Sequence, residues 1–369
     1  MSTLLSTEIA TKPAPLWLVG ASGLLAGELM RLLEMHPALR LAGAVSRSSG
    51  ADLSEMHPHL PIDNVTTTAE EAAGQIRESL QANAGEPHIV VLGLPHGDSA
   101  AFWCELRSAL GEDAESVYVV DLSADYRLHD RDVYAQWYGR EHADPEELAN
   151  FTYGLVEWKR DEIASSKRVA APGCFATALQ LATLPAARAG VLDAAQPWVL
   201  NAITGSSGSG NSPKPGTHHP HRHGNLWAYG LGGHRHEAEL RQSLSAAGVD
   251  PASLHFLPHS GPFVRGIHLT AFLPLASELT QADARAIYAD AYAGAAFIEI
   301  VESGVPDLRR VAGSNRVALS TNVRDGGLTV LLTLDNVIKG GAGQALQCLN
   351  LMLGLPESLG LPVAGLGVV

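Results

Sequence analysis

The first half of this 369-residue chain alternates between short apolar runs and segments with helical spacing. The apolar runs are PLWLVG (15–20), LRLAGAVS (39–46), HIVVLGL (88–94) and VYVVDLS (117–123). Runs without polar alternation are typical of strands that are buried on both faces of a parallel sheet. The segment GLLAGELMRLLEMH, between the first two runs, has apolar residues at helical spacing. The alternation predicts a doubly wound α/β domain.

The second half of the chain has longer runs that partly alternate polar and apolar residues. They are PWVLNAITG (197–205), GIHLTAFLPL (266–275), RVALSTNVRDG (316–326) and LTVLLTLDN (328–336). Asp325-Gly326-Gly327, between the last two, is typical of a hairpin turn. Helical spacing returns at 282–294 and 342–354. This half therefore predicts an α+β domain with a mostly antiparallel sheet.

Composition limits the function classes. The formal net charge of −14 argues against nucleic acid or an anionic membrane as the main partner. Three cysteines make a poor disulfide framework and favour a reducing compartment. No apolar run approaches the ~20 residues that cross a bilayer, and the N-terminus lacks the pattern of a signal peptide. We expect a soluble, cytoplasmic protein with a loose N-terminal tail over residues 1–14.

The stretch GASGLLAGE places three glycines after the first expected strand and at the start of a helix. Glycines there let the backbone turn tightly and approach a pyrophosphate, and the helix N-terminus offers free N–H groups. We expect Gly20, Ser22, Gly23 and Gly27 to contact a dinucleotide in a Rossmann-type domain. A plain tight turn is the alternative, because three glycines alone are weak evidence.

The end of the second strand indicates which dinucleotide this would be. An acidic residue there would bind the ribose hydroxyls of NAD. The chain has Ser46, Arg47, Ser48 and Ser49 instead. A cation and hydroxyl groups suit a 2′-phosphate, so we expect NADP(H). The alternative is a solvated loop.

Cys174 lies in RVAAPGCFATALQ, where a run of helix formers begins. The positive end of a helix stabilises a thiolate and can lower the pKa of the thiol. Cys104 and Cys348 lie inside apolar helical patterns and resemble core residues. Cys174 is therefore either a nucleophile or a third core cysteine. A nucleophilic cysteine beside a dinucleotide fold suggests acyl or aldehyde chemistry.

Six histidines fall between residues 218 and 236. In HRHEAEL, His236 and Glu239 share a helix face, so the carboxylate would orient an imidazole that relays protons for the cysteine. His234 would point elsewhere and contact the substrate. If neither has such a role, both histidines are solvated. The spacing of HHPHRH matches no standard metal site, so we expect no metal.

The segment 205–224 is rich in glycine, serine, proline and histidine, which predicts a functional or mobile loop. With Lys214, Arg222 and Arg235 it predicts a basic patch that receives an acidic partner.

Eight stretches, taken together, resemble the N-acetyl-γ-glutamyl-phosphate reductase family of arginine biosynthesis. They are similar as well to its relative in carrier-protein-dependent lysine biosynthesis. The stretches span about residues 15–355 in the family's order: GASGLLAGELMRLL, LGLPHGDSA, VVDLSADYRL, FTYGLVEW, APGCFATA, HRHEAEL, VRGIHLT and LDNVIKGGAGQALQCLN.

The resemblance implies that NADPH reduces an acyl phosphate to an aldehyde through a cysteine thioester. It assigns the nucleophile to Cys174 and proton transfer to His236, supported by Glu239. Substrate-binding candidates are Arg127 for the leaving phosphate, Arg265 for the carboxylate end, and Ser123. The chain would return to the cofactor site after the last strand, where Asn336, Gly341 and Gly343 would contact the cofactor.

The resemblance also implies the domain boundaries. We expect an NADP-binding domain over 15–173 and 337–369, and a catalytic, substrate-binding and dimerisation domain over 174–336. The protein would be a homo-oligomer, as a dimer or tetramer.

One segment departs from the family. Where we expect SGVSGAGR, the chain has TGSSGSGNSPKPGTHHPHRHGN, without the arginine. This leaves two substrates open: the free N-acetylated glutamyl phosphate, which we favour, and an aminoadipyl or glutamyl phosphate on an acidic carrier protein. Three further functions would each use part of these features: an aspartate-semialdehyde-dehydrogenase-like enzyme, a non-catalytic NADP-binding protein and a metal hydrolase.

Overall fold

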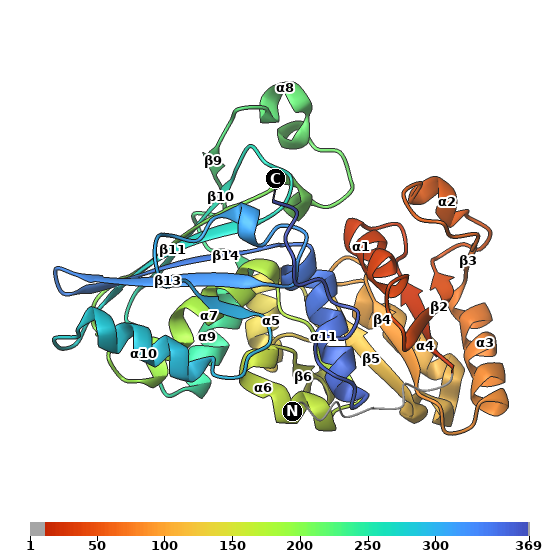
Figure 1. Ribbon diagram of the computed structural model, residues 1–369. Helices are drawn as coiled ribbons and strands as arrows, with labels where there is room; N and C mark the ends of the chain where they lie inside the picture. The colour runs from red at the N-terminus through yellow and green to blue at the C-terminus, as the bar shows by residue number, and fades with distance from the viewer. Residues whose placement is uncertain (1–11, 368–369) are drawn as a thin grey trace, which may run out of the picture.

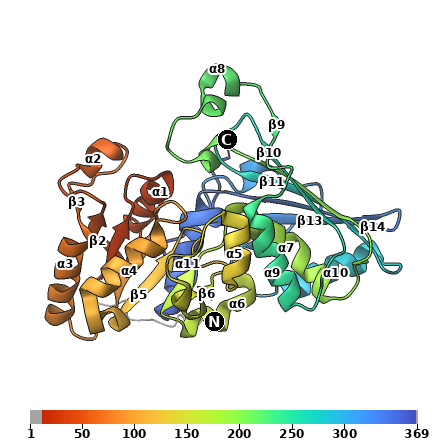
Figure 2. The same ribbon diagram turned by 180° about the vertical axis from the view of Figure 1, so that it is seen from behind.

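The computed structural model describes residues 12–367, and its chain folds around two seven-stranded sheets (Figure 1). Most of the expected N-terminal tail lies outside the described residues, and the first strand begins at Ala14. The two sheets lie side by side, and the chain crosses from one to the other and back (Figures 1 and 2).

The first sheet has the strand order β3-β2-β1-β4-β5-β7-β6, and every pairing in it is parallel. Its strands are β1 (Ala14–Val19), β2 (Leu39–Val45), β3 (Thr66–Thr67), β4 (His88–Leu92), β5 (Val117–Asp121), β6 (Thr152–Tyr153) and β7 (Arg168–Ala170). The connecting helices are α1 (Leu24–Leu33), α2 (Leu53–Met56), α3 (Ala69–Ala82), α4 (Ser99–Leu110), α5 (Arg131–Tyr138) and α6 (Val156–Ser165). Apolar cores lie on both faces, which confirms the doubly wound prediction.

The second sheet has the order β12-β13-β14-β11-β8-β10-β9. Its strands are β8 (Trp198–Thr204), β9 (Trp227–Ala228), β10 (Leu254–Ser260), β11 (Ile267–Pro274), β12 (Ile298–Ile300), β13 (Val317–Arg324) and β14 (Gly327–Leu334). Four of its six pairings are antiparallel, as expected, while β8–β10 and β12–β13 are parallel. Asp325 and Gly326 form the expected hairpin turn with φ of 50° and 73°.

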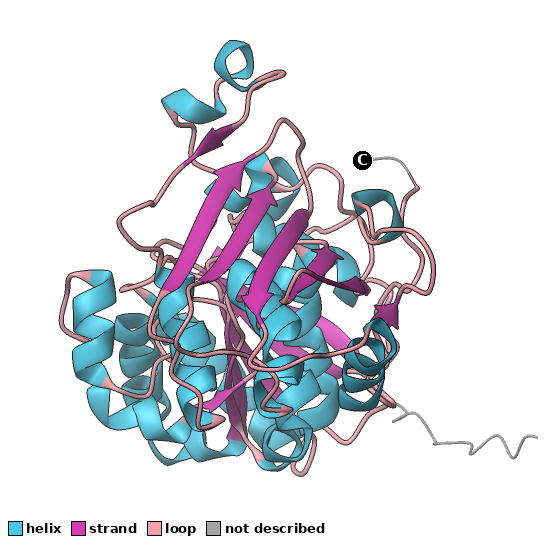
Figure 3. Ribbon diagram, turned by 90° about the vertical axis from the view of Figure 1, so that its left-hand side faces the viewer, coloured by secondary structure: helices cyan, strands magenta, loops and turns pink. Residues whose placement is uncertain are grey.

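One face of the second sheet is covered by three helices, α7 (Cys174–Arg188), α9 (Arg235–Ala246) and α10 (Gln281–Ala291). Figure 3 shows the strands of this sheet in front of helices. Helix α7 follows β7 directly, so its first residue lies where the first sheet ends and the second domain begins. That position is the centre of the candidate site.

After β14 the chain returns to the first sheet through a π-helical turn, η6 (Ile338–Ala342), and α11 (Gly343–Met352). Helix α11 joins the core between α1, α6 and the first sheet. The return of the last helix agrees with the sequence-based expectation, whereas the π-helical turn was not expected.

The segment 205–224 projects from the end of the second sheet in Figures 1 and 2. It contains the short helices η3 (Ser206–Ser209), η4 (Pro215–Thr217) and α8 (His219–Arg222). Asn211 Nδ2 donates to the carbonyl of Ser22 at 3.1 Å, so the segment contacts the glycine-rich turn of the first domain.

No helix within residues 12–367 has both the length and the apolar character needed to cross a membrane.

Candidate active site

Cys174 is the first residue of α7 and is half-buried. Gly173, in extended backbone, is the N-cap, so the thiol lies at the start of the helix, where the N–H groups of Cys174 and Phe175 act on it. Gly340 of the π-helical turn lies against the cysteine, since a Cβ on Gly340 would stand 2.6 Å from Cys174 Cβ. Sequence reasoning missed Gly340, although it lies in the stretch LDNVIKGGAG.

His236 approaches the residue before the nucleophile. A Cβ on Gly173 would overlap the imidazole of His236 and would lie 2.9 Å from Nη1 of Arg127. Only glycine therefore fits between the cysteine, the imidazole and the guanidinium. Burial, followed by the charges of His234 and Arg127, lowers the pKa of His236 well below its usual value. The imidazole is therefore neutral and can accept a proton.

His234 has a different place from the one expected. Its Nδ1 accepts the backbone N–H of His236 at 3.3 Å, so the side chain caps α9. Its ring packs edge-on against Phe175, Tyr229 and Phe256. Burial and Arg235 lower the pKa of His234 to about 4. This geometry favours His236 over His234 as the proton carrier.

Glu239 is fully buried and does not orient His236 as the helix spacing suggested. Its Oε2 accepts the N–H of Gly173 at 3.0 Å and the hydroxyl of Tyr153 at 2.8 Å. Nδ1 of His236 has no hydrogen-bond partner among the described residues. The expected Glu239–His236 bond was wrong, because the turn before Cys174 takes the carboxylate. Tyr153, which sequence reasoning missed, lies in the stretch FTYGLVEW.

Arg127 lies at the bottom of the site and is buried. Its Nε donates to the carbonyl of Ala171 at 2.7 Å, and its Nη2 donates to the carbonyl of Leu122 at 2.9 Å. Nη1 pairs with Glu239 at 3.4 Å. These bonds aim the guanidinium at the turn before Cys174.

Ser123 has an internal role in place of the substrate contact expected for it. Its hydroxyl donates to Asp121 at 2.8 Å and accepts the N–H of Asp125 at 3.0 Å. The side chain therefore stabilises the turn that carries Arg127.

Two further basic residues, His96 and Arg235, lie at the site, where the sequence analysis did not place them. Arg235 hydrogen-bonds to the imidazole of His96 and lies 5.7 Å from the ring centroid of Tyr138. Burial and the charge of Arg235 lower the pKa of His96, so the imidazole is neutral and can accept that bond. His96 lies in the stretch LGLPHGDSA, which could have marked it. Together with Arg127, these groups give an acidic protein a locally positive site that suits an anionic substrate.

The thiol itself departs from the expectation for a helix N-terminus. Burial raises the pKa of Cys174 to about 11, although Arg127 and the N–H of Phe175 act to lower it. The resting pair is therefore a neutral thiol and a neutral imidazole. A thiolate formed by loss of this proton would be stabilised by the N-terminus of the helix and by Arg127.

This protonation state gives an expected pH dependence. Only the thiolate reacts with iodoacetamide, so the rate of alkylation of Cys174 should rise about tenfold per pH unit from pH 7 towards 10. Mass spectrometry of the Cys174 peptide over a pH series measures that rate. A plateau below pH 8 would contradict the account, because it would mean that the resting pair is thiolate and imidazolium.

The glycine-rich turn forms a cradle for a pyrophosphate. Gly20 has φ of +81°, and a Cβ there would stand 2.8 Å from the backbone of Gly93. Gly23 is the N-cap of α1 and makes no side-chain cap, which leaves the helix N–H groups open. Gly27 instead makes room for the imidazole of His57, whose Nε2 hydrogen-bonds to the carbonyl of Ala21. These residues fit a bound dinucleotide.

The loop after β2 lies at the same edge of the sheet. Arg47 is 77% exposed and pairs with Asp98 at 3.0 Å. An exposed pair of this kind is weak, so the guanidinium is available to a ligand. The backbone groups of Ser46 and Ser48 are tied to the neighbouring strand by hydrogen bonds with Thr67 and Thr66.

The three residues expected to contact the cofactor after β14, Asn336, Gly341 and Gly343, contact other residues of the protein. Asn336 donates from Nδ2 to Ser207 at 2.9 Å and accepts the N–H of Gly266 at 2.6 Å. Gly341 lies against Leu25 of α1, and Gly343 lies against Asn315. These contacts join the end of β14 to α1 and to the segment 205–224. A cavity of about 380 Å³ lies between the same elements, lined in part by Leu24, Ser207 and Val337.

Arg265 is not available for the carboxylate end of a substrate. Its guanidinium forms ion pairs with Glu28 and Asp335, two carboxylates of the protein itself. The expectation for Arg265 is corrected on this ground.

The basic patch expected on the segment 205–224 was wrong for Arg222. This side chain is 7% exposed, bonds to Ser260 at 2.5 Å and lies 5.0 Å from the ring centroid of Trp227. It holds the segment to β10 instead of facing a partner.

Within the described part of the chain, no group of three or more histidine, cysteine or carboxylate side chains is arranged to hold a metal ion.

Comparisons with known proteins agree with this architecture. Residues 16–166 match the family model of the semialdehyde dehydrogenase NAD-binding domain, and residues 174–336 match the semialdehyde dehydrogenase dimerisation domain. Aspartate semialdehyde dehydrogenase II of Vibrio cholerae has the same fold, with a TM-score of 0.64 at 16% identity over 93% of this chain and 99% of that chain. The protein therefore belongs to the class of two-domain semialdehyde dehydrogenases.

Full-length relatives define the family more narrowly. The chain is 36% identical over 355 residues to the N-acetyl-γ-glutamyl-phosphate reductase of Laribacter hongkongensis, covering 95% of this chain and 98% of the relative. It is 39% identical to that of Saccharopolyspora erythraea, covering 94% and 97%. The chain belongs to the N-acetyl-γ-glutamyl-phosphate reductase family. These relatives do not favour the carrier-bound substrate.

Proposed function

We propose that the protein reduces N-acetyl-γ-glutamyl phosphate to N-acetylglutamate 5-semialdehyde with NADPH, releasing phosphate. The observation that carries this proposal is the placement of His236 and Arg127 on the residue before Cys174. A thiol, a neutral base and a guanidinium in one place suit attack on an acyl phosphate. The family supports the choice of substrate.

The residues of the chain have separate tasks in this reaction. His236 accepts the proton of Cys174 as the thiolate attacks the acyl carbon, and the bond from that carbon to the phosphate oxygen breaks. Arg127 stabilises the phosphate that leaves, and the phosphate takes up one proton from solvent and departs as hydrogen phosphate. The N–H groups at the start of α7 stabilise the oxyanion that forms on the acyl group. The result is a thioester on Cys174.

The second half of the reaction returns the cysteine to its starting state. When bound, NADPH supplies the hydride that reduces the thioester carbon. His236 returns its proton to the oxygen of the reduced carbon, then removes it as the carbon–sulfur bond breaks and gives it to the departing thiolate. Free aldehyde and thiol remain.

NADPH is our choice of cofactor because Arg47 replaces the acidic residue that an NAD site would use. Replacing Arg47 with alanine should raise KM for NADPH about tenfold, since one charge-assisted bond to the 2′-phosphate is lost. KM for NADH should stay unchanged. Arg40→Ala, at an exposed position in β2, the strand that precedes Arg47, is the matched control. Equal effects on NADPH and NADH would count against a 2′-phosphate contact.

We further propose a homo-oligomer formed through the second domain, which matches a dimerisation domain. We place the protein in the cytoplasm, because Cys104, Cys174 and Cys348 are all free thiols.

The reverse reaction tests the proposed function. Wild-type protein should reduce NADP⁺ with N-acetylglutamate 5-semialdehyde beyond one equivalent per active site only when phosphate is present, because phosphate must discharge the thioester before a second turnover. Absorbance at the NADPH band follows this directly. Equal rates with and without phosphate would show an aldehyde dehydrogenase that uses water, and the phosphate role of Arg127 would fall.

A further inference from the structure

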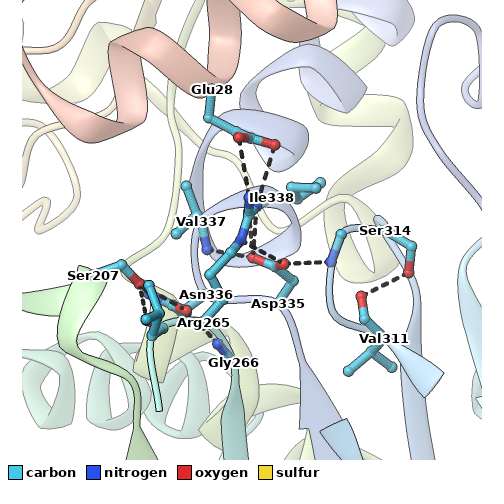
Figure 4. Close-up of polar contacts among 12 residues, drawn as sticks. Glu28, Ser207, Arg265, Gly266, Val311, Ser314, Asp335, Asn336, Val337 and Ile338 are labelled. Atoms are coloured by element: carbon cyan, nitrogen blue, oxygen red, sulfur yellow. Dashed lines mark hydrogen bonds and ion pairs between the residues drawn. The ribbon is translucent and has the colours of Figure 1, made fainter. Parts of the chain in front are cut away.

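The guanidinium of Arg265 joins the first helix of the dinucleotide-binding domain to the end of β14 (Figure 4). Nη1 donates to Oε2 of Glu28 in α1 at 3.3 Å. On its other side, Nε and Nη2 donate to the two carboxylate oxygens of Asp335 at 3.1 and 3.3 Å. Arg265 itself precedes β11, so one side chain links two domains.

Asp335 organises the turn that follows it. The side chain is fully buried. Beyond the arginine, its carboxylate accepts three backbone N–H groups: Gly313 at 2.6 Å, Val337 at 2.9 Å and Ile338 at 3.1 Å. A carboxylate with this many bonds fixes the start of the π-helical turn relative to the arginine.

The same turn covers the nucleophile. The carbonyl of Asp335 accepts the N–H of Gly340 at 2.9 Å, and Gly340 is the residue that lies against Cys174. Gly341, next in the chain, lies against Leu25 of α1. A shift of Asp335 would therefore move the surface against which the cysteine packs.

The α1 end of this link is a buried carboxylate with two partners. Burial alone would raise the pKa of Glu28, but the bonds from Arg31 and Arg265 hold the pKa below its usual value. Glu28 stays ionised and keeps its attraction for both arginines. Arg31 lies in the same helix and binds Glu28 at 2.6 Å, so it stabilises the carboxylate without joining the domains.

We propose that Arg265 is a positioning residue that holds the covering turn over Cys174 in a fixed place relative to α1. The proposal rests on the proposed function. It also explains the residue type, because a planar guanidinium can bind one carboxylate with two nitrogens and reach a second, which an ammonium group cannot reproduce.

The test compares Arg265→Met and Arg265→Lys with Arg31→Met, which removes the other partner of Glu28. For each full-length variant we would measure kcat and KM in the reverse reaction, and the rate of alkylation of Cys174 by iodoacetamide. Arg265→Met should lower kcat about 10- to 100-fold and leave KM for the semialdehyde within about threefold, since misplaced reacting groups reduce the chemical step. Its alkylation rate should change at least about threefold, and lysine should restore only part of kcat. Arg31→Met should match wild type.

Three results would overturn the proposal. One is a folded Arg265→Met variant with wild-type kcat and alkylation rate. Another is an equal loss in Arg31→Met. A third is a large rise in KM for the semialdehyde at unchanged kcat, which would mean a substrate contact.

If Arg265→Met does not fold, Glu28→Met decides the matter, because it removes the carboxylate of α1 that binds Arg265 and leaves the Asp335 pair in place. A partial loss of kcat at an unchanged Tm is expected, and an unchanged kcat would overturn the proposal. Failure of the proposed function would appear differently, as missing phosphate-dependent activity in wild type. The alkylation comparison needs no substrate and would still report on Arg265.

Discussion

Replacing Cys174 with serine should lower kcat in the phosphate-dependent reaction by about 10⁴-fold or more, because the covalent route is lost. A serine hydroxyl has nearly the size of the thiol but is a far weaker nucleophile at neutral pH. The Cys174→Ser substitution should leave the fold and cofactor binding intact, so Tm and Kd for NADPH should match wild type.

Cys104→Ser is the matched control for this change. Cys104 is half-buried in α4, away from the start of α7, and should keep full activity. If Cys174→Ser retained more than about one part in a hundred of wild-type kcat, a role as the obligatory nucleophile would be excluded.

Replacing His236 with asparagine should lower kcat by about 10²- to 10⁴-fold, the usual loss when a general base is removed. The thiol of Cys174 has a pKa of about 11, so without a base little thiolate forms near neutral pH. The remaining activity should therefore rise with pH up to 10, whereas wild type gains less over the same range. Rates across a pH series separate these two behaviours.

The exposed His223, in the histidine-rich segment, provides the comparison. His223→Gln should behave as wild type at every pH. A His236→Asn variant with a flat pH profile and a small loss would show that another group moves the proton.

The sequence allowed much of the framework to be predicted, because the relevant signals are local. The strand, the glycine-rich turn and the helix from β1 to α1 lie within 20 residues of one another. The hairpin at Asp325 follows from the backbone freedom of two adjacent residues. Cys174 at the start of α7 follows from the helix formers after it. Each of these depends on neighbours in the chain.

The parts that sequence reasoning missed depend on partners far away in the chain. Helix spacing placed Glu239 beside His236, but the carboxylate binds Gly173 and Tyr153, which come from the other domain. The helix N-terminus suggested a low pKa for Cys174, whereas burial dominates and raises it. Arg265 was noticed as a cation, but its two carboxylate partners lie 237 and 70 residues away.

The central claim is that Cys174 carries the acyl group as a thioester. The most direct test is the mass of the enzyme and of its Cys174 peptide after incubation with the semialdehyde and NADP⁺ in the absence of phosphate. Hydride transfer can then proceed, but the thioester cannot be discharged by phosphate. We expect an added N-acetylglutamyl group on the peptide that contains Cys174, and its disappearance when phosphate is added. A wild-type enzyme that turns over with phosphate but never carries the acyl group on Cys174 would contradict the account.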